Sequence, residues 1–139
     1  MKNLTMSLGS ALLISSLALT AADKKPAKPD LSKLPPAATT TVDFDKEIMP
    51  FLEKSCVKCH SGEKPKSKYV MDSKANVIKG GKEGVAVIPG KSVESPIVHY
   101  VADAVEDMEM PPTEKRDKYP ALTKAQIGLL RAWIDQGAK

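Results

Sequence analysis

Residues 56–60 are the most informative part of this chain, because their types and spacing suit one particular chemistry. They read Cys-Val-Lys-Cys-His, and Cys56 and Cys59 are the only two cysteines among 139 residues. This C-x-x-C-H pattern is the attachment signature of a c-type haem. Each thiol can add to one vinyl group of a single porphyrin, and His60 can supply an axial imidazole to the iron. We expect the free ring N–H of His60 to donate to a backbone carbonyl, with Pro65 as the candidate acceptor. The motif therefore predicts one covalent haem c.

Other uses of this cysteine pair have to be weighed against haem attachment. A redox-active C-x-x-C needs a strand–helix–strand setting, and no such pattern surrounds the motif. A structural zinc site usually needs four nitrogen or sulfur ligands. The two cysteines, His60 and the distant His99 are the whole supply of Cys and His in the chain. A simple disulfide between Cys56 and Cys59 stays possible, but it leaves His60 without a role. Covalent haem is the interpretation that uses all three motif residues.

A second axial ligand is expected for a low-spin electron-transfer haem, and it is usually methionine or histidine. Met110 is the favoured candidate, because Pro111 follows it and proline disfavours helical backbone in the preceding residue. Met110 should therefore lie in a stiff loop that can hold its thioether over the iron. Met108 is the close alternative, and His99 or an open site is the remaining one. The other methionines of the mature chain are interpreted as core or surface residues.

Two helical segments are expected in the first half of the folded region. Apolar residues recur with helical spacing from Phe44 to Ser55, directly before the haem motif. Asp43 is a plausible N-cap, and Pro50 should either kink this helix or begin a second one. A short helix over residues 72–79 should end at the two glycines that follow it.

Two further helices are expected in the second half. Ser95 and Pro96 suit the N-cap and the first helical position of a helix that runs to about Val105. Thr123 and Gln126 form a T-x-x-Q capping box ahead of a wide apolar stripe. We expect this last helix to contact both the first helix and the edge of the haem.

The N-terminal region reads as an export signal followed by a linker. Residues 1–22 combine Lys2, an apolar run too short for an ordinary membrane span, and a small-residue cleavage region. An uncleaved N-terminal anchor is the alternative. Residues 23–41 are rich in Lys, Pro, Ala and Thr, which predicts a flexible or partly polyproline linker. Residues 42–139 should then form the folded domain, with one haem because the motif occurs once.

The distribution of charge bears on possible partners. The formal net charge is +4, and the chain has no basic face with interleaved aromatic residues, which argues against nucleic-acid binding. Lysines surround the haem motif, and they suit a basic rim that steers an acidic redox partner. An ordinary solvated surface is the alternative interpretation. The residues concerned are Lys54, Lys58, Lys64, Lys66 and Lys68.

Over residues 42–139 the chain resembles the planctomycete-type cytochrome c domain, which is also common in verrucomicrobial proteins. The resemblance rests on the C-x-x-C-H motif and on three later segments. These segments are Val-Ile-Pro-Gly-Lys-Ser at 87–92, Met-Pro-Pro at 110–112 and Trp-Ile-Asp-Gln-Gly-Ala at 133–138. The resemblance implies an all-α monohaem cytochrome c fold of about four helices packed around a covalent haem.

The same resemblance implies a set of site residues. Cys56 and Cys59 would form the thioether bonds, His60 would be the proximal iron ligand and Met110 the distal one. Because family members often carry this domain at the front of longer proteins and this chain ends after it, we expect a free-standing carrier or a subunit.

The combined expectation is a soluble periplasmic cytochrome that carries single electrons and is not an enzyme. Its partners would be redox proteins, acidic ones if the basic rim steers them, and no membrane span should remain after signal cleavage. One alternative is a haem accessory subunit docked to a larger periplasmic dehydrogenase. The other is a haem sensor or peroxidase with an open distal site, which requires that Met110 does not bind the iron.

Overall fold

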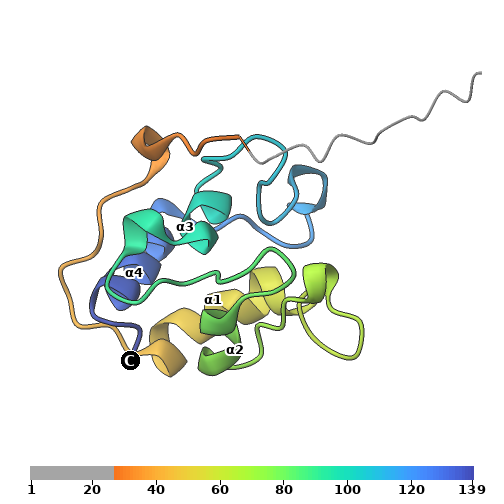
Figure 1. Cartoon of the computed structure of the whole chain (residues 1–139), viewed down its shortest axis with the longest axis horizontal. Helices are drawn as coiled ribbons and strands as arrows, with labels where there is room; N and C mark the ends of the chain where they lie inside the picture. The colour runs from red at the N-terminus through yellow and green to blue at the C-terminus, as the bar shows by residue number, and fades with distance from the viewer. Residues whose placement is uncertain (1–26) are drawn as a thin grey trace, which may run out of the picture.

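The computed structural model describes residues 27–139, so the signal peptide predicted at residues 1–22 lies outside the described part. The described residues form four α-helices. Shorter helical turns and loops join them (Figure 1). No β-strand forms among the described residues, which confirms the predicted all-α class for this part of the chain. None of the helices in this range has both the length and the apolar character needed to cross a bilayer.

A continuous helical stretch leads into the haem motif, as the apolar spacing predicts. It consists of a π-helical turn at Phe44–Ile48, helix α1 at Met49–Leu52 and a second π-helical turn at Glu53–Val57. Asp43 caps its start, because its carboxylate accepts the backbone N–H of Lys46 at 3.0 Å. Pro50 lies in the first turn of α1, where a missing backbone N–H costs least. The sequence predicts a kink or a second helix at Pro50. In the structure, the π-helical turn ends at Ile48 and α1 begins at Met49, directly before this proline.

Helices α2 and α3 are shorter than the sequence predicts. Helix α2 spans Lys74–Lys79 and begins two residues late, because Ser73 at its N-cap position has extended backbone with a φ of −157° and a ψ of 156°. Helix α3 spans Pro96–Val101 and does not reach Val105, so that expectation is wrong. The chain leaves helical backbone there because Asp103 adopts a left-handed conformation with a φ of 54°.

Ser95 lies at the N-cap position of α3, but its side chain does not cap the helix. Its hydroxyl donates to the carbonyl of Lys91 at 2.9 Å and accepts the N–H of Ile88 at the same distance. Ser95 is fully buried, so these bonds satisfy a polar group that water cannot reach. The residue therefore closes the preceding loop instead of the helix.

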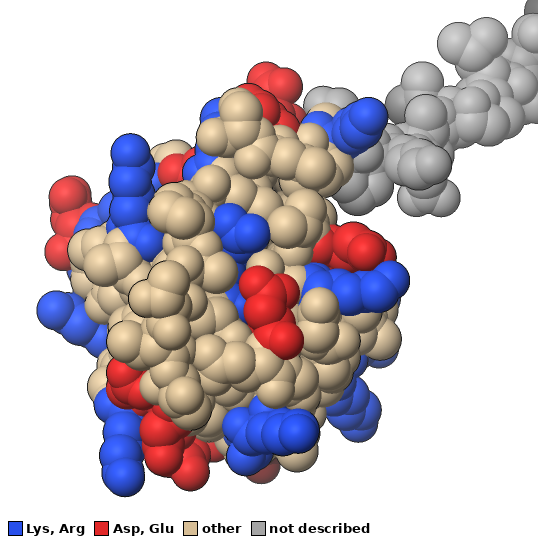
Figure 2. Space-filling view, turned by 90° about the vertical axis from the view of Figure 1, so that its left-hand side faces the viewer, with Lys and Arg blue, Asp and Glu red and all other residues tan. Residues whose placement is uncertain are grey.

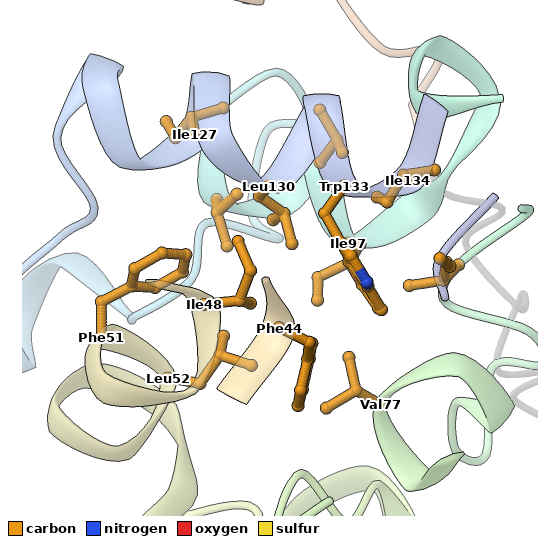
Figure 3. Packing of buried hydrophobic residues seen from close by; sticks show 14 of the residues in the cluster. Phe44, Ile48, Phe51, Leu52, Val77, Ile97, Ile127, Leu130, Trp133 and Ile134 are labelled. Carbon is orange, nitrogen blue, oxygen red and sulfur yellow. The ribbon is translucent and has the colours of Figure 1, made fainter. Parts of the chain in front are cut away.

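Helix α4 spans Lys124–Asp135 and confirms the predicted capping box. The hydroxyl of Thr123 accepts the N–H of Gln126 at 3.2 Å, and the amide oxygen of Gln126 accepts the N–H of Thr123 at 2.8 Å. The apolar face of α4 packs on the first helical stretch (Figure 3). Phe44 and Trp133 meet there with ring centroids 4.8 Å apart.

Residues 30–40, here called the strap, run along the outside of the domain before the chain turns into Phe44 (Figure 1). The N–H of Ala38 donates to the carbonyl of Gly128 on α4 at 2.9 Å, and Arg131 of α4 donates to the carbonyl of Pro35. The strap is therefore held against the domain at these points, where composition predicts a flexible or partly polyproline linker. Composition does not reveal these bonds, because their partners lie about ninety residues further along the chain. The domain boundaries themselves stay predictions.

Charged side chains are mixed in sign on the face shown in Figure 2. Blue and red groups alternate around a largely uncharged area, and no single sign dominates this face. Long-range steering toward a strongly charged partner would need an area of one sign. This face alone does not offer one.

Candidate functional site

A cavity of about 110 Å³ opens to solvent between the helical stretch of the motif and the loop after α3. Its lining is mainly apolar, and it is contributed by segments that lie between Ser55 and Tyr119. Burial raises the pKa of two tyrosine phenols in this lining, so both stay protonated at neutral pH. The apolar lining residues include Tyr69, Met71, Val85, Ala86, Ile97, Tyr100 and Val101.

Both cysteines of the motif line this cavity, and both thiols are free. The Cys59 N–H and the His60 N–H each donate to the carbonyl of Cys56 at 3.1 Å, so the motif continues as a tight helical turn. Cys56 is buried, and this burial raises the pKa of its thiol to about 12, with the nearby Cys59 as a second cause. The turn thus presents two unpaired sulfurs to one apolar space.

His60 also lines the cavity, and one of its ring nitrogens is held by the backbone. Nδ1 lies 3.2 Å from the carbonyl oxygen of Tyr69, so Tyr69 and not Pro65 is the acceptor. The sequence offered no signal for this pairing, because it depends on how the loop after the motif folds back. In the tautomer that makes the bond, Nδ1 donates and Nε2 keeps its lone pair. Burial lowers the pKa of His60, which favours the neutral imidazole that a metal needs.

The loop that ends at Tyr69 is itself fixed at several points. The Tyr69 hydroxyl donates to the carbonyl of Val77 on α2 at 2.7 Å. The N–H of Met71 donates to the carbonyl of His60 at 2.8 Å, and the Tyr69 ring lies edge-on to the His60 ring with centroids 5.6 Å apart. Tyr69 therefore determines the orientation of the imidazole through both its backbone and its ring.

Both candidate methionines, Met108 and Met110, line the same cavity. Met110 packs against the hydrophobic core, and its N–H donates to the carbonyl of Tyr100 at 3.0 Å. Met71 is a third methionine in the lining, which the sequence interpretation treated only as a core or surface residue; it is buried with 3% of its surface exposed. Its backbone bond to His60 keeps it beside the imidazole.

Two other side chains with donor atoms, His99 and Met49, lie outside the cavity lining. His99 is absent from the lining, and its Nε2 lies 2.7 Å from the carbonyl oxygen of Val93. His99 thus has a backbone partner away from the cavity. Met49 packs against the core from the first helical stretch and does not line the cavity.

The donor set in the cavity suits a large apolar group that is bound by sulfur and nitrogen. Two thiols and an imidazole come from one turn, and thioethers come from a loop some fifty residues later. Within residues 27–139 no cluster of three or more His, Cys, Asp or Glu side chains could hold a bare metal ion. The two thiols, the imidazole and the thioethers of this mainly apolar cavity fit a porphyrin that Cys56 and Cys59 would hold through thioether bonds.

Comparison with known families supports this chemical interpretation. Residues 56–114 match the family model of planctomycete cytochrome C, so the match includes the C-x-x-C-H motif and both loop methionines. A search of curated proteins and a search of solved structures each gave no match. A cytochrome c domain indicates a haem-binding electron-transfer protein. Residues 56–114 therefore match the planctomycete cytochrome C domain that the motifs of the chain predict.

Proposed function

We propose that this protein is an exported, periplasmic cytochrome that carries single electrons on one covalent haem c. One observation carries the proposal: Cys56, Cys59, His60 and Met110 all line a single, mainly apolar cavity. Cys56 and Cys59 would hold the haem through thioether bonds, and His60 Nε2 and the Met110 sulfur would be the axial ligands. Bound in this way, the haem supplies an iron that alternates between its ferrous and ferric states.

The protein residues around the site would orient the ligands and exclude water. The Tyr69 carbonyl accepts from Nδ1 of His60, which fixes the ring plane and directs Nε2 away from the backbone. The apolar lining keeps the surroundings of low polarity, and the two tyrosine phenols in it stay neutral. These features favour a ligand geometry that stays the same in both oxidation states. Electron transfer is then fast, because few atoms have to move when the iron changes its charge.

Met110 is preferred over its competitors as the distal ligand. It packs against the core and its backbone is tied to Tyr100, whereas Met108 does not belong to the hydrophobic core cluster. Met71 is tied to the backbone of His60, which argues for a place on the proximal side. If the Met110 thioether holds the iron, it would leave no position for oxygen or peroxide, so a carrier is favoured over a sensor or a peroxidase.

The predicted export signal and the compartment in which c-type haem is attached support a periplasmic location. Redox proteins are the proposed partners. The five lysines named for the basic rim are all exposed, which is compatible with contact to an acidic partner.

The spectrum of the haem-loaded protein tests the proposal. The full chain is produced with haem-attachment machinery and recorded oxidised and reduced, together with Met110→Ala and Met108→Ala. We expect a low-spin haem that stays bound after denaturation, and a methionine–iron charge-transfer band that disappears only in Met110→Ala. A high-spin wild-type spectrum that shifts with cyanide or carbon monoxide would instead favour a sensor or peroxidase. Stable co-purification with a large dehydrogenase would favour an accessory subunit.

A further inference from the structure

We propose that Arg116 is a positioning residue that holds the Met110 loop in place over the cavity. The loop meant here is residues 102–112, which connect the end of α3 to the segment after Met110. The inference rests on the proposed role of Met110 as a ligand. It adds a specific side chain, outside the cavity lining, on which that ligation depends.

The guanidinium of Arg116 binds both ends of this loop. Its two terminal nitrogens donate to the carboxylate of Asp103, at 2.6 Å to Oδ1 and 2.9 Å to Oδ2. Its Nε donates to the carbonyl of Pro111 at 3.0 Å. Asp103 stands at the beginning of the loop, and Pro111 directly follows Met110. One planar group therefore closes the loop, and the two-pronged contact with a carboxylate fixes direction as well as distance.

The backbone needs such a closure, because the loop begins in an unfavourable conformation. Asp103 has a φ of 54°, in the left-handed region that residues with a side chain rarely adopt. The Lys33 ammonium donates to the carbonyl of Asp103 at 2.7 Å, and the N–H of Asp30 donates to the carbonyl of Ala104 at the same distance. The strap and Arg116 thus hold the start of the loop from two sides.

The consequence of losing Arg116 should be local. The side chains of Arg116 and Asp103 are 25% and 39% exposed, and ion pairs with this much solvent contribute little to global stability. The contacts of Arg116 with Asp103 and Pro111 should instead keep Met110 at the cavity when the loop fluctuates. A lysine would keep the charge but cannot donate to Asp103 and Pro111 in one plane, so Arg116→Lys should behave like Arg116→Ala.

Displacement of methionine by added imidazole in the ferric, haem-loaded chain measures this directly. An external ligand binds only when the loop opens, so its apparent affinity reports the open fraction. We expect imidazole to bind roughly tenfold more tightly to Arg116→Ala, Arg116→Lys and Asp103→Asn than to the wild type. Amide hydrogen exchange should also become faster within residues 102–112. Lys91→Ala is the matched control, because it breaks an exposed ion pair with Glu94 at 3.2 Å, away from the cavity lining.

The outcomes separate this inference from the proposed function. Wild-type imidazole affinity and wild-type loop exchange in the Arg116 and Asp103 variants would overturn the positioning role while leaving Met110 as ligand. A charge-transfer band that is absent from the wild type, or that survives in Met110→Ala, would overturn the ligand assignment itself. If Arg116→Ala fails to fold, Arg116→Lys and Asp103→Asn give the same two measurements, and unchanged values in both would overturn the inference.

Discussion

The imidazole Nδ1 of His60 lies 3.2 Å from the carbonyl oxygen of Tyr69, nine residues further along the chain. This pairing makes a backbone loop the outer support of the proposed proximal ligand. The loop is in turn anchored by the Tyr69 hydroxyl on α2. Changes that displace Tyr69 should therefore affect the haem without altering His60 itself.

Gly81→Ala tests this support. A Cβ at Gly81 would lie 2.6 Å from the Cβ of Tyr69 and 2.6 Å from the carbonyl oxygen of Ser67, which forces the tyrosine to move. We expect a loss of about 1–3 kcal/mol in the free energy of unfolding, as for overpacked sites, together with a changed reduction potential. Denaturant titration and potentiometry of the haem-loaded protein measure the two effects.

Gly62→Ala is the control for that substitution. Gly62 has a φ of +76°, but a Cβ there would meet no atom within 4 Å. Its replacement should cost about 1–2 kcal/mol through backbone strain alone and leave the potential unchanged. Equal potentials in the wild type and Gly81→Ala would show that the Tyr69 support does not tune the haem.

The two thiols should differ in reactivity when no haem is attached. Burial raises the pKa of Cys56 to about 12, so this thiol stays protonated at pH 8. Alkylation by iodoacetamide requires the thiolate, and Cys59 is less buried than Cys56. In chain produced without haem attachment, Cys59 should be modified first, and the Cys56 rate should still rise with pH above 8. Peptide mass spectrometry reads both rates; modification of Cys56 first would contradict the buried placement.

Ser92 should be important for stability although it is far from the motif in sequence. Its side chain has 1% of its surface exposed, donates to the Asp135 carboxylate at 2.9 Å and accepts from Arg131 at 3.1 Å. Ser92→Ala leaves two charged groups short of a partner and should cost about 1–3 kcal/mol in unfolding free energy. Ser32→Ala removes an exposed hydroxyl contact with Asp30 and should change stability by less than about 0.5 kcal/mol. Denaturant midpoints that match for the two variants would argue against the Ser92 network.

The basic rim predicts a dependence of reaction rate on salt. If the five exposed lysines steer partners, reduction of a negatively charged oxidant should slow as ionic strength rises, because screening weakens attraction. A positively charged oxidant should show the opposite trend. Stopped-flow rates between about 10 mM and 1 M salt, where the screening length falls roughly tenfold, measure this. Rates that do not respond to salt would mean that these lysines are an ordinary solvated surface.

Features encoded by neighbouring residues were predicted well. The capping box of Thr123 and Gln126 and the N-cap at Asp43 are found in the structure, because both depend on residues three positions apart. The C-x-x-C-H motif is equally local, and the family match over residues 56–114 confirms what it indicates about the class of protein.

Features that depend on distant residues were missed. The early end of α3 follows from the left-handed Asp103, whose side chain and carbonyl bind Arg116 and Lys33. The acceptor for His60 was assigned to Pro65, since nothing in the local sequence shows that the chain returns to bring Tyr69 close. The strap was interpreted as a linker because proline and lysine dominate it, and the residues that hold it belong to α4.

The strap also determines which contacts of the domain would bear a mechanical force applied to the chain. Tension applied at the N-terminal end of the described residues would first load the contacts of Asp30 and Lys33 with residues 103 and 104. These contacts lie at the base of the loop that carries Met110, whereas the thiols at 56 and 59 lie beyond the far end of the strap. If the domain is tethered at this end, mechanical load would reach the distal side of the site before it reaches the attachment turn.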